Sequence, residues 1–201
     1  SISGLIAGLG VGGLAVALAA QKTLADVFGS VMLLADRPFS IGDWVVSPDK
    51  EIEGTVERIG FRSTRIRTFD QTLVTIPNSR LADFVINNMS QRPVRRVWIT
   101  VGLTYGTQVN QMKEAVSKID SLLRAHSEVD QDSTILVYFT DFGDSSLNIM
   151  VYYFANTTVW GEYLRVREDV NLKIMKVVED LGLSIAFPTR TVHLEHSAES
   201  G

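Results

Sequence analysis

The sequence contains no cysteine and little charge near its start. Without cysteine there are no disulfides, no thiolate catalysis and no cysteine-based metal sites. The net charge of −4 disfavours a general nucleic-acid binder, which would be basic on at least one face. The first 35 residues carry only Lys22 and Asp26 as charged side chains, and all other charge follows from Asp36 onward. A lipid-compatible segment therefore precedes a water-soluble body.

The opening stretch, residues 1–21, is uncharged and consists mostly of Gly, Ala, Leu and Val. About 20 helical residues match a hydrocarbon core of roughly 30 Å, so this stretch can span a membrane. Small residues at spacings of three and four let helix backbones approach closely, which is how helices associate in lipid. The small residues in question are Gly4, Gly8, Gly12, Ala15 and Ala19.

The larger residues Val11, Leu14 and Leu18 fall on a different line of this predicted helix, separated by three and four positions. If copies of the helix form a ring through their small faces, the two leucines point inward. Two leucine rings make a narrow apolar constriction that gates a pore by dewetting.

Two alternatives compete for the same stretch. The segment GLGVGG matches the GxGxxG pattern at Gly8, Gly10 and Gly13, with Asp36 further along, which is the pattern of a dinucleotide-binding turn in a soluble enzyme. That turn requires a preceding strand and later βαβ units, which the sequence does not offer. The second alternative is a buried helix of a soluble protein, because Gly and Ala also suit a tightly packed core.

A bend is predicted at Gln21 to Thr23, where polar residues interrupt the apolar run. The first half of residues 1–37 would then span the membrane, and the second half would lie at the interface until Pro38 ends the helix. Lys22 and Asp26 are four residues apart and can pair on one helix face. Because Ser1 already has mid-helix character, we expect further membrane helices upstream.

Residues 38–92 predict a small antiparallel barrel, and residues 93–189 predict an α+β domain. The barrel strands are expected at 44–46, 53–59, 65–68 and 72–76, separated by turn residues. The second domain has the β-α-β-β-α-β order of a ferredoxin-like unit. Its strands are expected at 97–101, 134–140, 146–154 and 184–187, and its helices at 107–125 and 161–181.

The remaining residues, 190–201, contain an alternating stretch at Thr191 to His196 that has no partner strand within the chain. Copies from several subunits can pair these strands and close an inter-subunit barrel. His193 and His196 near this end also invite a metal interpretation. Residues three apart on a strand point to opposite faces and no third ligand accompanies them, so we predict no metal site.

Several motifs together resemble the mechanosensitive channel of small conductance (MscS) family over essentially the whole chain. They are the Gly/Ala helix, the RPF-x-x-G-D step at Arg37 to Asp43, and the IPN turn at Ile76 to Asn78 followed by Asn87. The resemblance implies a homo-oligomer, usually of seven subunits, which is not an enzyme and needs no cofactor. It implies a pore helix in the inner membrane of a cell, followed in the cytoplasm by a small β domain with an Sm-like fold and an α/β domain that forms a hollow chamber. It also implies opening by membrane tension, with release of ions and small osmolytes during hypo-osmotic shock.

Carried over by position, Leu14 and Leu18 match the pore-sealing leucines of the family. The helix-packing stretch corresponds to Gly8, Gly12, Gly13, Ala15 and Ala19. The sequence departs from the family at Lys22, where a glycine often follows Gln21 at the helix kink, so glycine flexibility cannot cause a kink here. Lys22 either extends to lipid headgroups or forms a ring near the pore exit that favours anions.

One more rival is an RNA-binding Sm-like module. It would use the arginines at positions 58, 62, 65, 67, 92, 95 and 96. Contact with anionic lipid or salt bridges between subunits explain these arginines better beside a membrane segment, so we expect lipid and self as partners and no nucleic acid.

Overall fold

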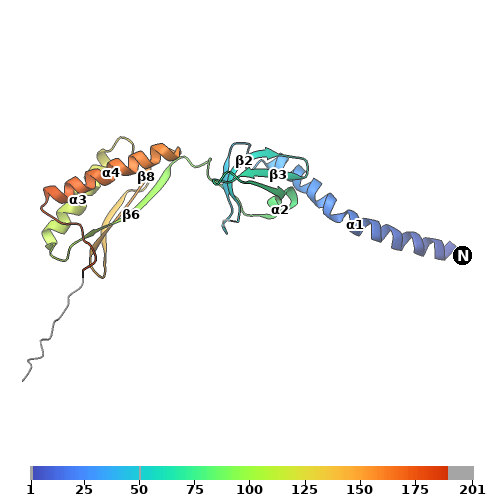
Figure 1. Cartoon of the computed structure of the whole chain (residues 1–201), viewed down its shortest axis with the longest axis horizontal. Helices are drawn as coiled ribbons and strands as arrows, with labels where there is room; N and C mark the ends of the chain where they lie inside the picture. The colour runs from blue at the N-terminus through green and yellow to red at the C-terminus, as the bar shows by residue number, and fades with distance from the viewer. Residues whose placement is uncertain (1, 50, 190–201) are drawn as a thin grey trace, which may run out of the picture. The chain divides into compact units, whose positions relative to one another are not determined.

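The computed structural model describes residues 2–49 and 51–189 and divides the chain into two units, Ser1–Arg92 and Pro93–Gly201 (Figure 1). Each unit has its own hydrophobic core. The stretch at Thr191 to His196, with its predicted inter-subunit strand and its histidines, lies outside the described residues.

The first unit begins with one long helix, α1 (Ile2–Asp36). It extends well beyond the β domain that follows it (Figure 1). The helix ends where Arg37 adopts a left-handed conformation with φ of 45° and Pro38 removes a backbone donor. The predicted helical region and its end at Pro38 therefore agree with the structure.

The β domain is a five-stranded antiparallel sheet in the order β4-β3-β2-β1-β5. Strands β1 (Trp44–Val46) and β2 (Glu53–Ile59) have the predicted bounds. The others are β3 (Ser63–Arg67), β4 (Leu73–Pro77) and β5 (Asn87–Asn88). A short helix, α2 (Asn78–Asp83), follows β4 directly. The apolar residues of alternate strand positions form the core with Leu33 of α1 and Leu81 of α2.

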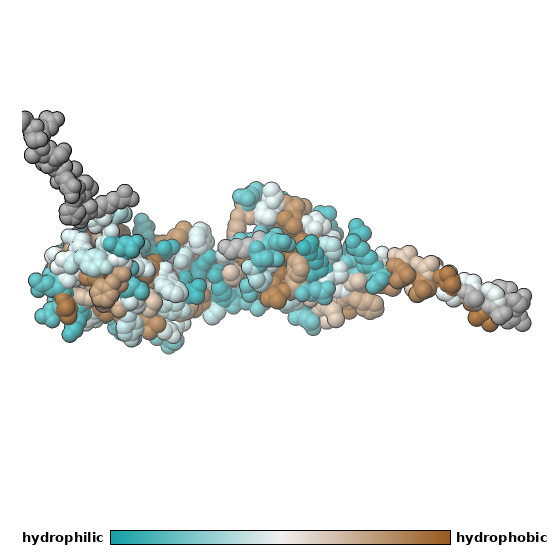
Figure 2. Space-filling view, turned by 90° about the horizontal axis from the view of Figure 1, so that it is seen from below, coloured by the Kyte–Doolittle hydropathy of each residue, from teal (hydrophilic) through white to brown (hydrophobic). Residues whose placement is uncertain are grey.

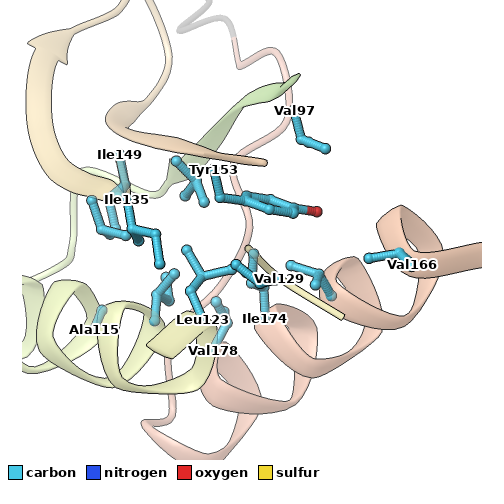
Figure 3. Packing of buried hydrophobic residues seen from close by; sticks show 14 of the residues in the cluster. Val97, Ala115, Leu123, Val129, Ile135, Ile149, Tyr153, Val166, Ile174 and Val178 are labelled. Carbon is cyan, nitrogen blue, oxygen red and sulfur yellow. The ribbon is translucent and has the colours of Figure 1, made fainter. Parts of the chain in front are cut away.

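The second unit places two helices on a three-stranded antiparallel sheet in the order β6-β8-β7. Its elements are β6 (Arg95–Leu103), α3 (Val109–Ala125), β7 (Leu136–Phe142), β8 (Leu147–Ala155) and α4 (Trp160–Asp180). Strand β8 is central, and every second residue from Leu147 to Ala155 is buried. Figure 3 shows the core between the sheet and the two helices, with Tyr153 and Ile149 of β8 facing Leu123 of α3 and Ile174 of α4.

The strand predicted at 184–187 is wrong as a full strand. Only a single bridge joins Ile185 to Leu103 of β6. Two backbone hydrogen bonds flank it, from Thr104 N to Ser184 O at 3.1 Å and from Ala186 N to Gly102 O at 2.8 Å. Over the described residues, the outer edge of β6 is otherwise unpaired before Gly102.

Candidate functional site

The first half of α1 exposes its apolar side chains. The predicted pore-lining residues Val11, Leu14 and Leu18 are 71%, 62% and 63% exposed. The exposed surface of α1 beyond the β domain is white to brown on the hydropathy scale of Figure 2. Within the described residues, Gly8–Asp36 is long and apolar enough to cross a membrane, and little of it is buried. Because exposed apolar side chains are unfavourable in water, this half requires lipid or other helices around it.

The predicted helix-packing residues are equally open. A Cβ added to Gly8, Gly12 or Gly13 would meet no atom within 4 Å, and Ala15 and Ala19 are exposed. A helix surface made of such small residues allows the backbone of a second helix to approach closely. In a single chain these residues contact no other element, so the structure leaves their role as helix contacts a prediction.

The second half of α1 is attached to the β domain along one face. Asp26, Gly29, Ser30 and Leu33 are all buried. A Cβ on Gly29 would lie only 2.6 Å from the Cα and N atoms of Ser79 in α2. Glycine is therefore required at position 29, because any side chain would push the two helices apart.

A buried polar cluster completes this attachment, and we call it the polar anchor: Asp26 and Ser30 of α1 with Asn78 and Ser79 of α2. Ser79 Oγ donates to the carboxylate of Asp26. Asn78 Nδ2 donates to Ser30 Oγ at 2.8 Å, and the Ser30 hydroxyl donates to the carbonyl of Asp26 at 2.8 Å. The polar anchor thus joins residues about fifty positions apart in the sequence.

Asn78 is the centre of the polar anchor and is fully buried. Besides Ser30, its Nδ2 donates to the carbonyl of Gly60 at 2.9 Å, and its Oδ1 accepts from the Thr64 hydroxyl at 2.8 Å. One side chain therefore connects α1, the β2–β3 loop and β3. Removing one member of a buried network leaves its partners unsatisfied, at a cost of about 1–3 kcal/mol for each group.

The predicted pairing of Lys22 with Asp26 is wrong. Among the described residues Lys22 forms no ion pair, and the carboxylate of Asp26 is buried against Ser79. Helix α1 also runs without interruption through Gln21 and Lys22, both exposed. In this structure the helix is continuous at these two residues, and a kink there stays a prediction.

The Arg37 to Asp43 segment follows the end of α1 and is held by a turn at Ser40 to Asp43. Gly42 has a φ of 96°, a conformation that side chains rarely adopt. Asp43 Oδ2 accepts from the Ser40 backbone N–H and from Asn88 Nδ2, both at 2.8 Å. The step therefore holds the end of α1 against strand β5, through Asn88 rather than the exposed Asn87.

The structure contradicts the dinucleotide-binding interpretation. Gly8, Gly10 and Gly13 lie inside α1, and the residues described before them are helical too, so they cannot form a turn between a strand and a helix. The described ranges, 2–49 and 51–189, also contain no group of three or more acidic or histidine side chains that could hold a metal ion.

Several arginines of the RNA-binding alternative already have partners within the chain. Arg67 pairs with Glu57 at 2.7 Å, Arg92 lies over the ring of Trp44, and Arg95 lies over Trp160. These contacts involve three of the seven arginines named for that alternative.

A second cluster, in the other unit, ties the end of α3 to α4. Buried His126 lies 2.7 Å from Asp169, which also accepts from Lys173 at 2.6 Å. The hydrogen bond from Lys173, then that from His126, lowers the pKa of Asp169 below its usual range. The role of this cluster is to hold the helices together.

Two protein-family models match the chain, one in each of its two units. Residues 22–91 match the model of the mechanosensitive ion channel β-domain, and residues 97–185 match that of the MscS C-terminal domain. The low conductance mechanosensitive channel YnaI of Escherichia coli is 46% identical over 198 residues, which cover 98% of this chain and 57% of the relative. The small-conductance mechanosensitive channel MscMJ of Methanocaldococcus jannaschii is 47% identical over 194 residues, which cover 96% and 54%.

A solved structure agrees with these relatives. The closed-state crystal structure of Helicobacter pylori MscS has a TM-score of 0.77 and 25% identity, covering 98% of this chain and 75% of that one. The chain belongs to the MscS family of mechanosensitive ion channels, which is not a class of enzymes. It spans about half the length of the curated relatives that it matches.

Proposed function

We propose that this chain is the pore-forming part of a mechanosensitive ion channel subunit. Membrane tension opens the channel, which passes ions and small osmolytes during hypo-osmotic shock. The observation that supports the proposal most directly is the contrast within α1. Its first half exposes Val11, Leu14 and Leu18 and has no buried residue among those described, whereas one face of its second half is buried against the β domain through the polar anchor.

In the proposed assembly, seven copies of α1 surround a central axis. The small residues Gly8, Gly12, Gly13, Ala15 and Ala19 form the contacts between helices. Val11, Leu14 and Leu18 then face the axis, since their positions lie on a neighbouring sector of the helix. The resulting constriction excludes water when narrow and conducts when the ring widens.

The polar anchor gives this ring a fixed base. Gly8, Ala15, Ala19, Asp26 and Ser30 follow spacings of seven and four, so the small face of the first half continues into the anchored face of the second. Everything from Asp26 onward is held by the β domain, while the exposed part before Gln21 is free to tilt. A bend at Gln21 and Lys22 would fall at this transition.

The remaining features follow the same proposal. The full-length protein would have several transmembrane helices in the inner membrane, contact lipids and carry its soluble body in the cytoplasm. We also infer that the five-stranded sheet is an Sm-like barrel and that the second unit follows a ferredoxin-like plan. In a ferredoxin-like plan, the segment that bridges to β6 at Ile185 would occupy the position of the fourth strand. Residues 190–201 would supply the strand of an inter-subunit barrel.

Recording from the full-length protein in bilayer patches tests the proposal. Suction applied to the patch should open discrete conductance steps whose probability rises with tension, and empty bilayers should show none. A protein that inserts as an oligomer but stays silent up to patch rupture would contradict the proposed function.

A further inference from the structure

The sheet of the second unit has two faces of different character. Helices α3 and α4 cover one face, to which Ile149 and Tyr153 of β8 point (Figure 3). Alternate residues of the same strands point the other way, because successive side chains of a strand lie on opposite faces. We call this second face the open face, since no described helix or strand of the second unit packs on it. Its larger side chains are Arg96 and Trp98 of β6, Tyr138 of β7, and Met150, Tyr152 and Phe154 of β8.

Aromatic side chains gather at one end of the open face. Trp98 lies directly opposite Tyr152 in the β6–β8 ladder, and Phe154 follows Tyr152 by two residues on the same face. We call these three residues the aromatic cluster. Trp98 is 59% exposed, and the other two are partly exposed. Because a group of exposed apolar side chains is unfavourable in water, such a patch commonly marks a binding site.

The rings of the aromatic cluster stand nearly at right angles to their neighbours. The ring centroids of Trp98 and Tyr152 are 6.1 Å apart with the planes at 73°, and those of Tyr152 and Phe154 are 5.4 Å apart at 85°. Two perpendicular rings form a corner, and a compact rounded group can contact both of its walls at once. A flat nucleobase would instead stack on one ring only. Since aromatic faces carry negative charge and attract quaternary ammonium groups, the corner favours a methylated ammonium.

Arg96 adds a positive charge beside the aromatic cluster. It precedes Trp98 by two residues, so both side chains lie on the open face, and it lies opposite Phe154 in the ladder. Arg96 is exposed and forms no ion pair with any residue that the structure describes. A guanidinium group binds a carboxylate through two parallel hydrogen bonds, but it repels a ligand that carries only positive charge. The ligand that suits both features therefore carries a carboxylate as well as an ammonium.

We propose that the open face binds a small zwitterion of the betaine class, which joins a methylated ammonium to a carboxylate. The ammonium lies in the corner between Trp98 and Tyr152, and the carboxylate pairs with Arg96. Residues two apart on a strand are separated by about 7 Å, a spacing that a short zwitterion can bridge. The inference goes beyond the proposed channel function, because binding to the second unit can be measured without opening the channel.

Saturation-transfer NMR tests the binding, since it detects weak ligands on a large protein. The full-length protein is purified in a maltoside detergent, which contains no ammonium group, and glycine betaine is the probe. We expect clear saturation of its methyl protons. Two other ligands separate the contributions: a dimethylbutanoate ion of the same shape, in which carbon replaces the ammonium nitrogen, and choline, which lacks the carboxylate. Both should give a signal several-fold weaker than that of betaine.

Variants locate the site on the open face. Trp98→Leu should lower the betaine signal several-fold, and Trp98→Phe should restore part of it. Arg96→Gln changes only an exposed side chain and should lower the betaine signal without lowering that of choline. Phe142→Leu is the matched control, because Phe142 is 75% exposed but lies opposite the buried Leu147 and so on the helix-covered side of the sheet. It should bind betaine as the native protein does.

Three results would overturn the proposal. Equal signals from betaine and the uncharged analogue would reduce the cluster to a simple apolar patch. An unchanged betaine signal in both Trp98→Leu and Arg96→Gln would place any binding elsewhere. A stronger signal from adenosine monophosphate than from betaine would make the open face a nucleotide site. All three leave the proposed channel function standing, because recordings under tension test it separately.

Discussion

Asn78→Leu should uncouple α1 from the β domain while preserving most of the side-chain volume. The variant loses the hydrogen bonds to Ser30, Gly60 and Thr64, all made by a fully buried side chain. At about 1 kcal/mol net for each hydrogen bond, the loss is about 3 kcal/mol, and more if a buried group stays unsatisfied. That corresponds to about a hundredfold change in an equilibrium constant.

Hydrogen exchange of the detergent-solubilised full-length protein measures this loss locally. Peptides from the second half of α1 and from β3 should exchange about a hundredfold faster, while peptides from α4 should not change. Asn87→Leu is the matched control, because Asn87 is exposed and makes no side-chain hydrogen bond among the described residues. Unchanged exchange of α1 in Asn78→Leu would refute the view that the polar anchor holds this helix.

Other changes have equally definite expected results. Gly29→Ala should separate α1 from α2 and alter the tension threshold in patch recordings, because the added Cβ would lie 2.6 Å from the α2 backbone. Leu18→Ser should hydrate the constriction and lower that threshold, and an unchanged threshold would count against its place in the pore. Lys22→Gln should shift the reversal potential in a KCl gradient if Lys22 forms an anion-favouring ring; no shift would exclude that ring. The Asp169–Lys173 contact, which lowers the pKa of Asp169, should stabilise the second unit above about pH 4 and lose its effect in stronger acid, as thermal unfolding at several pH values will check.

The elements with strong local patterns could be predicted from the sequence. The uncharged Gly/Ala run indicated the exposed helix, and alternation gave β1 and β2 their observed bounds. Apolar spacing of three and four located α3 and α4 to within two residues at their starts. The exception was the strand predicted at 184–187, where the structure has only a single bridge. A short segment of alternating apolar and polar residues fits the strand pattern whether or not it pairs along its whole length.

The polar anchor could not be predicted, for a physical reason. Local spacing suggested Lys22 as the partner of Asp26, yet an exposed pair contributes little, and Asp26 instead bonds to Ser79, 53 positions away. The close approach of Gly29 to α2 could not be predicted either, although a glycine in the middle of a helix is a signal of close packing.

The central claim is that one sector of α1 faces a shared water-filled axis, and accessibility of single cysteines tests it most directly. Leu18→Cys and Val16→Cys place a thiol on opposite sides of α1 at positions with similar exposure, 63% and 69%. A charged methanethiosulfonate reagent applied to the open channel should change the unit conductance of Leu18→Cys and leave Val16→Cys unaltered. Equal modification of both variants, or modification of Val16→Cys alone, would contradict the claim.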